Sequence, residues 1–306
     1  MLILYYRINY KLNKFNNIKI NNFNTIKKNK SMLYSKFIFY PSFLGQSNTV
    51  IRNTPRMIYN LFQPINYQFV KYHPYNNNKN LENLYYANND LKRYQNHINI
   101  GGDHSMSIAT VAASLHKNPD VRVLWIDAHP DINTYQSSKT KNTHGMALSY
   151  LTGLDYEPSF QFLNDKNILL PFDNIMYLGI RDIDDYEKEI IQQHKIKYFT
   201  PQEFNNDFIS VLKEIDCFIG DNEFHLSFDV DALDPKYLNS TGTPVINGLN
   251  YEKTKYLLDY LLIHKNIINM DITELNLDIG NEKKSIYTFM HLFHNYTYHI
   301  SNKYKY

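Results

Sequence analysis

The chain has 306 residues, of which 43% are hydrophobic and 20% charged, and this suits one large globular domain or two small ones. The mean hydropathy is −0.48 and no stretch of about eighteen residues is both apolar and uncharged, which predicts that no helix spans a membrane. A single cysteine excludes a disulfide framework and a cysteine-ligated zinc site, and it favours a reducing compartment.

Basic and acidic residues are unevenly distributed along the chain. Residues 1–81 contain 12 Lys and Arg and no acid, whereas residues 82–306 contain the other 20 basic and all 30 acidic residues. We expect residues 1–35 to be a basic, disordered, low-complexity extension and residues 36–306 to be a single domain. A mitochondrial presequence is the alternative, although the first thirty residues contain one Arg and no Ser. The protein is therefore expected in the cytoplasm, or in the mitochondrion if the extension is a presequence. We expect it to bind neither nucleic acid nor a membrane.

From residue 36 onward, short apolar runs alternate with helical patterns. A polar stretch from Tyr75 to about Asn89 is typical of a loop. The alternation predicts a parallel sheet that is covered by helices on both faces, with the chemistry beyond the carboxyl ends of the strands. The expected strands are 37–40, 97–100, 121–126, 174–178, 225–228 and 267–270, and the expected helices are 54–62, 105–116, 184–195, 201–215 and 251–264.

Two clusters of polar residues follow the expected strands in the first half of the domain. Gly101 and Gly102 allow a sharp turn that places His104 at a strand end, although a helix cap with a surface histidine is the alternative. After strand 121–126, alternation puts Asp127, His129 and Asp131 on one face of an extended segment. Two carboxylates beside a buried strand would repel each other without a partner, so a metal site is favoured over a polar loop.

A third cluster contains Asp229 and Asp231 at the end of strand 225–228, where an Asp-rich turn is the alternative. Two ions with four protein contacts each need eight contacts, and six candidate ligands supply eight only if two of them bridge the ions. Asp127 and Asp229 are the most central carboxylates, so they are the expected bridges. Carboxylate and imidazole ligands without thiolate favour Mn²⁺ over Zn²⁺. The sequence therefore predicts two Mn²⁺ ions per subunit, with the metal ligands His104, Asp127, His129, Asp131, Asp229 and Asp231.

These clusters and four further segments resemble the ureohydrolases, and most closely the arginase family. The resemblance implies a three-layer α/β/α fold with a central, mostly parallel sheet, a homotrimer, and hydrolysis of L-arginine to L-ornithine and urea by a metal-bridging hydroxide. The family's Gly-Val-Glu segment is absent near Asn53, and Glu252-Lys253 reverses the charge order of a pair that the family uses between subunits. The segments that carry the resemblance are 101–105, 127–134, 144–153, 179–187, 227–235, 241–249 and 271–276.

The resemblance also implies roles for individual residues. His104, Asp127, Asp131 and Asp229 would bind one Mn²⁺, and Asp127, His129, Asp229 and Asp231 the other. Asp131 would hold the attacking hydroxide, His144 would transfer a proton, and Glu274 would bind the guanidinium group. Residues matching those that bind the α-carboxylate and α-amino groups of the substrate are Asn133, Ser138, Thr140, Asp184 and Glu187.

Other functions are weighed against this one. Agmatinase acts on a substrate without an α-carboxylate, so the hydroxyl groups at 138 and 140 favour arginase. A deacetylase of similar fold would bind one zinc and would not need His104 and Asp131 as ligands. A dinuclear phosphatase would need an Asn-His-Glu turn that is absent. A non-catalytic scaffold is disfavoured by the full set of ligands together with His144 and Glu274.

Overall fold

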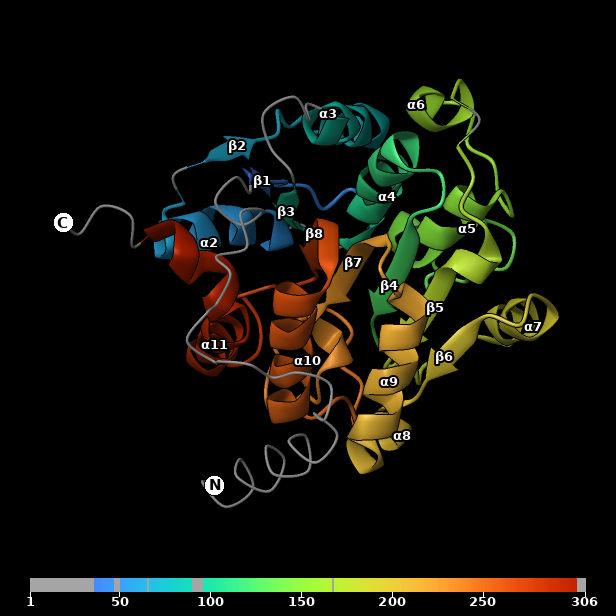
Figure 1. Cartoon of the computed structure of the whole chain (residues 1–306). Coiled ribbons are helices and arrows are strands. Elements are labelled where there is room, and N and C mark those ends of the chain that lie inside the picture. The colour runs from blue at the N-terminus through green and yellow to red at the C-terminus, as the bar shows by residue number, and fades with distance from the viewer. Residues whose placement is uncertain (1–35, 47–49, 65, 90–95, 167, 302–306) are drawn as a thin grey trace, which may run out of the picture. The chain divides into compact units, whose positions relative to one another are not determined.

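The computed structural model describes residues 36–46, 50–64, 66–89, 96–166 and 168–301, with side chains to residue 293 (Figure 1). The extension predicted at residues 1–35 lies outside these ranges. Among the described residues, no helix has the length and apolar character that crossing a membrane requires.

The centre of the described domain is an eight-stranded sheet in which every strand pair is parallel. The strand order is β2-β1-β3-β8-β7-β4-β5-β6, so neighbours in the sheet are often far apart in sequence. The strands are β1 Lys36–Phe39, β2 Tyr67–Phe69, β3 His97–Ile100, β4 Arg122–Ile126, β5 Ile175–Leu178, β6 Lys197–Phe199, β7 Glu223–Asp229 and β8 Asn266–Thr273.

Helices cover both faces of this sheet, which confirms the predicted three-layer α/β/α fold (Figure 1). Along β4, Val123 and Trp125 point into one hydrophobic core, and Leu124 and Ile126 point into the other, as strand alternation requires. The first core contains α3 Asn77–Asn89, α4 Ser107–Lys117, α5 Ala147–Thr152, α6 Gln161–Asn164 and α7 Asp185–Gln193. The second contains α2 Thr54–Phe62, α8 Pro201–Asn206, α9 Phe208–Ile219, α10 Tyr251–His264 and α11 Glu282–Ser301.

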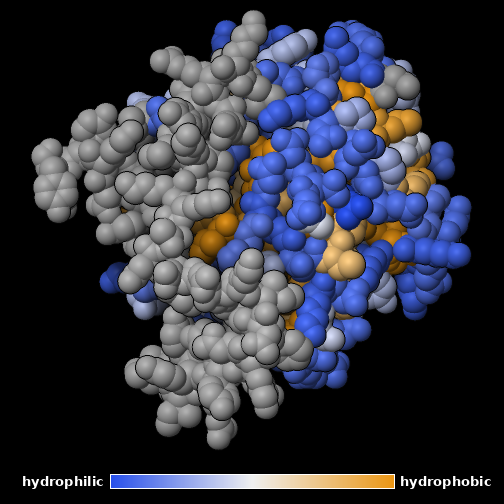
Figure 2. All heavy atoms as spheres, in the orientation of Figure 1, coloured by the Kyte–Doolittle hydropathy of each residue, from blue (hydrophilic) through white to orange (hydrophobic). Residues whose placement is uncertain are grey.

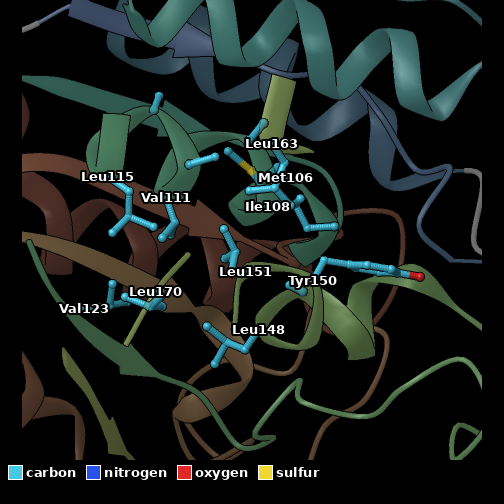
Figure 3. Packing of buried hydrophobic residues seen from close by; sticks show 14 of the residues in the cluster. Met106, Ile108, Val111, Leu115, Val123, Leu148, Tyr150, Leu151, Leu163 and Leu170 are labelled. Atoms are coloured by element: carbon cyan, nitrogen blue, oxygen red, sulfur yellow. The ribbon is translucent and has the colours of Figure 1, made fainter. Parts of the chain in front are cut away.

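Figure 3 shows part of the first core, where Leu151 of α5 lies below Val111 and Ile108 of α4. The outer sides of the helices are polar, so the face in Figure 2 is mostly hydrophilic where it is not grey. This is the expected arrangement for helices that bury one apolar side against a sheet.

The loop predicted for residues 75–89 is wrong, because Asn77–Asn89 forms helix α3. Leu81, Leu84, Tyr85 and Asn88 are buried at helical spacing, and α3 packs against α4. The many asparagines around these residues obscure the periodicity, since Asn has a low helix propensity. Tertiary packing therefore overrides the local composition.

The single helix predicted over 201–215 is also divided. Asp207 ends α8 and begins α9, where its side chain accepts a hydrogen bond from the amide of Ser210. Strands β2 and β6 were not predicted because each has only three residues. Both lie at the edges of the sheet, so their omission does not affect the prediction of the central strands.

The fold brings the predicted polar clusters to one edge of the sheet. Strands β3, β8, β7, β4 and β5 are consecutive in the sheet order, and each is followed by candidate site residues. Because the strands are parallel, their carboxyl ends meet at the same edge.

Candidate metal centre and substrate site

His104 follows β3 in a short 3-10 turn, η3 (His104–Met106). A Cβ on Gly102 would lie 1.6 Å from the carbonyl oxygen of Ser42, so only glycine allows this approach of the two segments. The carboxylate of Asp103 then accepts hydrogen bonds from the amides of Ser105 and Gly45, each 3.0 Å long. The turn therefore fixes the position of His104 at the end of the strand.

The Nδ1 atom of His104 faces three carboxylates. It lies 2.9 Å from Oδ2 of Asp127, 3.0 Å from Oδ2 of Asp131 and 3.2 Å from Oδ2 of Asp229. All four side chains are buried, and Nδ1 has no hydrogen bond of acceptable geometry. Four polar atoms converge here as ligands do around a cation.

A second group adjoins the first. The Nδ1 atom of His129 lies 3.4 Å from Oδ1 of Asp127 and 3.2 Å from Oδ2 of Asp231. Ligand atoms of His104, Asp127 and Asp229 lie within 4.8 Å of one another, and so do those of Asp127, His129 and Asp231. Asp127 is thus common to both groups, and Asp229 is a member of the first. The two aspartates have the same backbone contact, because Oδ1 of Asp229 accepts from the amide of Asp231 and Oδ1 of Asp127 accepts from the amide of His129, each at 2.8 Å.

The other nitrogen of His104 starts a chain of hydrogen bonds that fixes where its proton lies. The Asp271 carboxylate can only accept, so Ser107 donates to its Oδ2 (2.8 Å). Ser227 must then donate to Ser107 (3.1 Å) and accept from Nε2 of His104 (2.8 Å). Because Nε2 keeps a proton for Ser227, Nδ1 is the atom that faces the three carboxylates, and it would present a lone pair to a metal ion that takes the place of a proton there. These residues therefore fit a bound metal ion.

The electrostatics of the cluster also favour a cation. Burial, together with the charge of Asp127, raises the pKa of Asp131 to about 6. Burial and the charges of Asp231 and Asp127 raise the pKa of Asp229. Burial opposes ionisation of Asp127 too, but the two histidines outweigh it and lower its pKa. A divalent cation would remove this repulsion among buried carboxylates.

Glu274 follows β8 and receives three hydrogen bonds. Its Oε1 accepts from the His104 amide (2.9 Å) and lies 3.1 Å from Nδ1 of His144, and its Oε2 accepts from Nε2 of Gln46 (2.8 Å). Burial alone would lower the pKa of His144, but Glu274, with Asp131 and Asp103, raises it to about 9. The structure therefore brings His144 and Glu274 together beside the metal-ligand cluster.

Two of the residues predicted to bind the far end of the substrate, Asn133 and Glu187, contact a third, Asp184, which follows β5. Its Oδ2 accepts from Nδ2 of Asn133 (3.1 Å), and its Oδ1 accepts from Nζ of Lys139 (2.8 Å). The Lys139 ammonium lowers the pKa of Asp184 despite partial burial. Glu187 accepts from the amides of Asp184 and Ile132, and burial raises its pKa to about 8.

Ser138 and Thr140 lie on either side of Lys139 in the chain. The Ser138 hydroxyl accepts from the amide of Lys141 (3.0 Å), and the Thr140 hydroxyl accepts from the amide of Asn142 (3.2 Å). Each hydroxyl therefore keeps its hydrogen for an external acceptor.

Several residues in contact with the site were not predicted. Gln46 lies before the first segment that carries the family resemblance, and Lys139 lies among polar residues between two of those segments. Trp125 donates from Nε1 to Oδ2 of Asp127 (3.0 Å) and stacks on His104 with ring centroids 4.2 Å apart. Thr243 donates to Oδ2 of Asp231 (3.0 Å). The position of the sole tryptophan two residues before Asp127 was the one available signal.

The Arg181 side chain forms hydrogen bonds with backbone carbonyl groups around the site. Its five N–H groups face six carbonyl oxygens, so at least one hydrogen is shared, and the contacts include those with Asp231 (2.9 Å) and Gly179 (3.0 Å). One forked side chain thereby joins the end of β5 to the turn that carries Asp231.

The fold and the site together define a class: three-layer α/β proteins with two linked acid–histidine groups at the carboxyl edge of a parallel sheet. A family model described as the arginase family matches residues 43–297. The chain therefore belongs to the arginase family.

Individual relatives agree with this assignment. The chain is 37% identical over 189 residues to an arginase of Coccidioides posadasii, and the match covers 58% of each protein. It is 36% identical over 196 residues to the mitochondrial arginase-2 of Mus musculus, and that match covers 61% of this chain and 54% of the relative. The matched region thus spans little more than half of these curated relatives. The crystal structure of Entamoeba histolytica arginase with L-ornithine has 28% identity and a TM-score of 0.75, covering 85% of this chain and 98% of that one.

Proposed function

We propose that this protein is a manganese-dependent arginase that hydrolyses L-arginine to L-ornithine and urea. The observation that carries the proposal is the pair of acid–histidine groups that share Asp127, one of which surrounds the Nδ1 atom of His104. The relatives support the substrate, since the curated proteins similar to this chain are named arginases.

Two ions would be held by the six predicted ligands. His104, Asp127, Asp131 and Asp229 would bind one, and Asp127, His129, Asp229 and Asp231 the other. The oxygen-rich ligand set suits Mn²⁺. When bound, such a pair of ions supplies a hydroxide near neutral pH and stabilises negative charge on the reacting group.

The chain's own residues would position the substrate and move protons. The Glu274 carboxylate would accept hydrogen bonds from the planar guanidinium, in place of the donor that Gln46 now supplies at Oε2. The Asp131 carboxylate, which lies at the first acid–histidine group 3.0 Å from Nδ1 of His104, could accept a proton from the attacking hydroxide. His144 is mostly protonated at pH 7 because its pKa is about 9, so it could donate a proton to the leaving amine.

The far end of arginine would lie at the mouth of the site. Asp184, supported by Glu187, would accept from the α-amino group. Asn133 and the free hydroxyl hydrogens of Ser138 and Thr140 would donate to the α-carboxylate. Because agmatine lacks that carboxylate, these donors favour arginine.

We also propose a homotrimer, as the family resemblance implies. The reversed pair Glu252-Lys253 lies in the first turn of α10, and the Lys253 ammonium donates to the carbonyl of Asn205 within the chain. A trimer would therefore need other contacts than the family's usual pair. Light scattering coupled to size-exclusion chromatography would measure the mass, and a monomer at micromolar concentration would contradict the proposal.

We propose a cytoplasmic location, which the single cysteine supports. The mitochondrial arginase-2 of Mus musculus keeps the mitochondrion as the alternative. Imaging of the full chain with a fluorescent carboxyl-terminal fusion would distinguish the two compartments.

The test of the enzymatic proposal is a urea-release assay with added Mn²⁺ on L-arginine and agmatine. We expect urea from arginine at a kcat/KM at least tenfold higher than from agmatine. Faster hydrolysis of agmatine would contradict the substrate, and absence of urea from either compound would contradict the reaction.

A further inference from the structure

Lys139 places a cation of the chain itself within the segment proposed to bind the substrate's α-carboxylate. Its Nζ lies 2.8 Å from Oδ1 of Asp184, the carboxylate proposed to bind the α-amino group. In sequence it stands between Ser138 and Thr140, the two hydroxyl residues proposed as donors to the α-carboxylate. A positive and a negative side chain are therefore paired at the place where the zwitterionic end of the substrate would bind.

We propose that Lys139 is a specificity-determining residue, whose ammonium, held by Asp184, binds the α-carboxylate and selects an α-amino acid over the corresponding amine. The inference rests on the proposed function, because it assumes that the guanidinium end lies at Glu274. It goes beyond that function by adding a charged determinant that the family resemblance does not provide.

The hydrogen-bonding capacity of the pair is sufficient for both partners. An ammonium has three donors, and Asp184 occupies one of those of Lys139, so two are free for carboxylate oxygens. A carboxylate offers about four acceptor sites, and the contacts with Lys139, Asn133 and the backbone amide of Glu187 use three of them. The substrate's α-amino group can therefore join Asp184 without displacing Lys139.

Charge complementarity then separates arginine from agmatine. The zwitterionic end of arginine can lie against the pair with its amino group on Asp184 and its carboxylate on Lys139. Agmatine brings a second cation and no carboxylate, so it gains nothing from Lys139 and is repelled by it. Lys139 thus acts on discrimination between substrates rather than on the chemical step.

The exposure of the pair makes it suitable for mutation. The side chains of Lys139 and Asp184 are 83% and 40% exposed, and such surface ion pairs contribute little to folding. We therefore expect Lys139→Met to fold and bind metal like the wild type.

Lys141 provides a matched control in the same loop. Its Nζ donates to the carbonyls of Tyr135 and Gln136 and lies over the Tyr135 ring, not on Asp184. Lys141→Met therefore makes the same change in net charge without changing the pair. Lys139→Arg keeps the charge and serves as the conservative variant.

The experiment measures kcat and KM for L-arginine and agmatine in all four proteins with Mn²⁺. In Lys139→Met we expect kcat/KM for arginine to fall about five- to tenfold, mostly through KM, because a solvent-exposed charge contact is lost. The value for agmatine should stay the same or rise. Lys139→Arg and Lys141→Met should each keep the wild-type arginine-to-agmatine ratio within about twofold.

Three results would overturn the inference: an unchanged ratio in Lys139→Met, tighter arginine binding in that variant, or an equal loss in Lys141→Met. Tighter binding would mean that Lys139 competes with the α-amino group. If the wild type releases no urea from arginine, the proposed function fails. Calorimetry would then measure the binding of L-ornithine and putrescine to the wild type and Lys139→Met. A ratio of the two affinities that is the same in both proteins would overturn the inference, and a smaller preference for ornithine in Lys139→Met would support it.

Discussion

Asp131 and Glu274 share a backbone conformation that is uncommon for residues with side chains. Their φ angles are 51° and 62°, in the left-handed region that favours glycine and, to a lesser extent, Asp and Asn. Glu274 directly follows β8, and Asp131 lies in the ligand segment that follows β4. At each position the turn directs the carboxylate toward His104 and the metal-ligand cluster. Such strain is common where the surrounding structure holds a functional group in place.

Asp131→Asn should lower kcat by about 10³-fold, because the amide cannot accept a proton. Asparagine tolerates the left-handed conformation, so the variant should keep the melting temperature of the wild type to within a few degrees. Urea release and thermal unfolding would measure the two effects. Near-normal turnover in a folded variant would rule out the role of Asp131.

Glu274→Gln should raise KM for arginine at least tenfold, since a hydrogen bond between two charged groups is replaced by a neutral one. Glu274 is in neither acid–histidine group, so the bound manganese should not change. Elemental analysis and steady-state kinetics on the same preparation would test both statements. Loss of metal together with activity would instead indicate that Glu274 supports the ligands.

At the scale of elements, the amino terminus of α7 connects helix capping with the proposed substrate site. Asp184 and Glu187 form a capping box, in which the Glu187 carboxylate accepts from the amide of Asp184. The second oxygen of Glu187 accepts from the amide of Ile132, in the segment between Asp131 and Asn133. Helix α7 thus holds the ligand segment and the α-amino site together.

Glu187→Gln should change how stability depends on pH. Burial raises the pKa of Glu187 from 4.5 to about 8, so its contribution to stability is full below pH 4.5 and is lost as the pH rises through 8. The loss is a few kcal/mol at most by linkage. Glutamine at this position does not titrate. It has only one acceptor oxygen, so it loses the hydrogen bond with the amide of either Asp184 or Ile132.

The variant should therefore be less stable than the wild type at pH 5, and this deficit should shrink or reverse by pH 9. Chemical unfolding of the substrate-free proteins at both pH values would measure it. A deficit that grows with pH would contradict the raised pKa.

At the scale of the whole molecule, the proposed ions would help to hold the sheet edge together. The candidate ligands come from the ends of β3, β4 and β7, so a cation would join three strands that the chain reaches at widely separated points. Anything that binds the folded state alone increases its stability by mass action.

Removal of metal by a chelator should lower the melting temperature by about 5–10 °C, and added Mn²⁺ should restore it. His129→Ala should retain about half of the wild-type manganese, because His129 belongs to the second group only. Calorimetry and elemental analysis would check both. A melting temperature that is the same with and without chelator would contradict a metal bound within the core of the site.

The sequence by itself determined the class of fold, the central strands and the six candidate ligands, because period-2 apolar runs and alternating acid–histidine spacing are local properties. Helix α3 escaped this reading, since its burial depends on α4 rather than on its own asparagine-rich composition. The tertiary structure alone decided which distant groups meet. Gln46 reaches Glu274, Lys139 reaches Asp184, and Asp271 orients the proton of His104 through two serines. These contacts follow from the strand order β1-β3-β8-β7-β4-β5, which the order of the strands along the chain does not reveal.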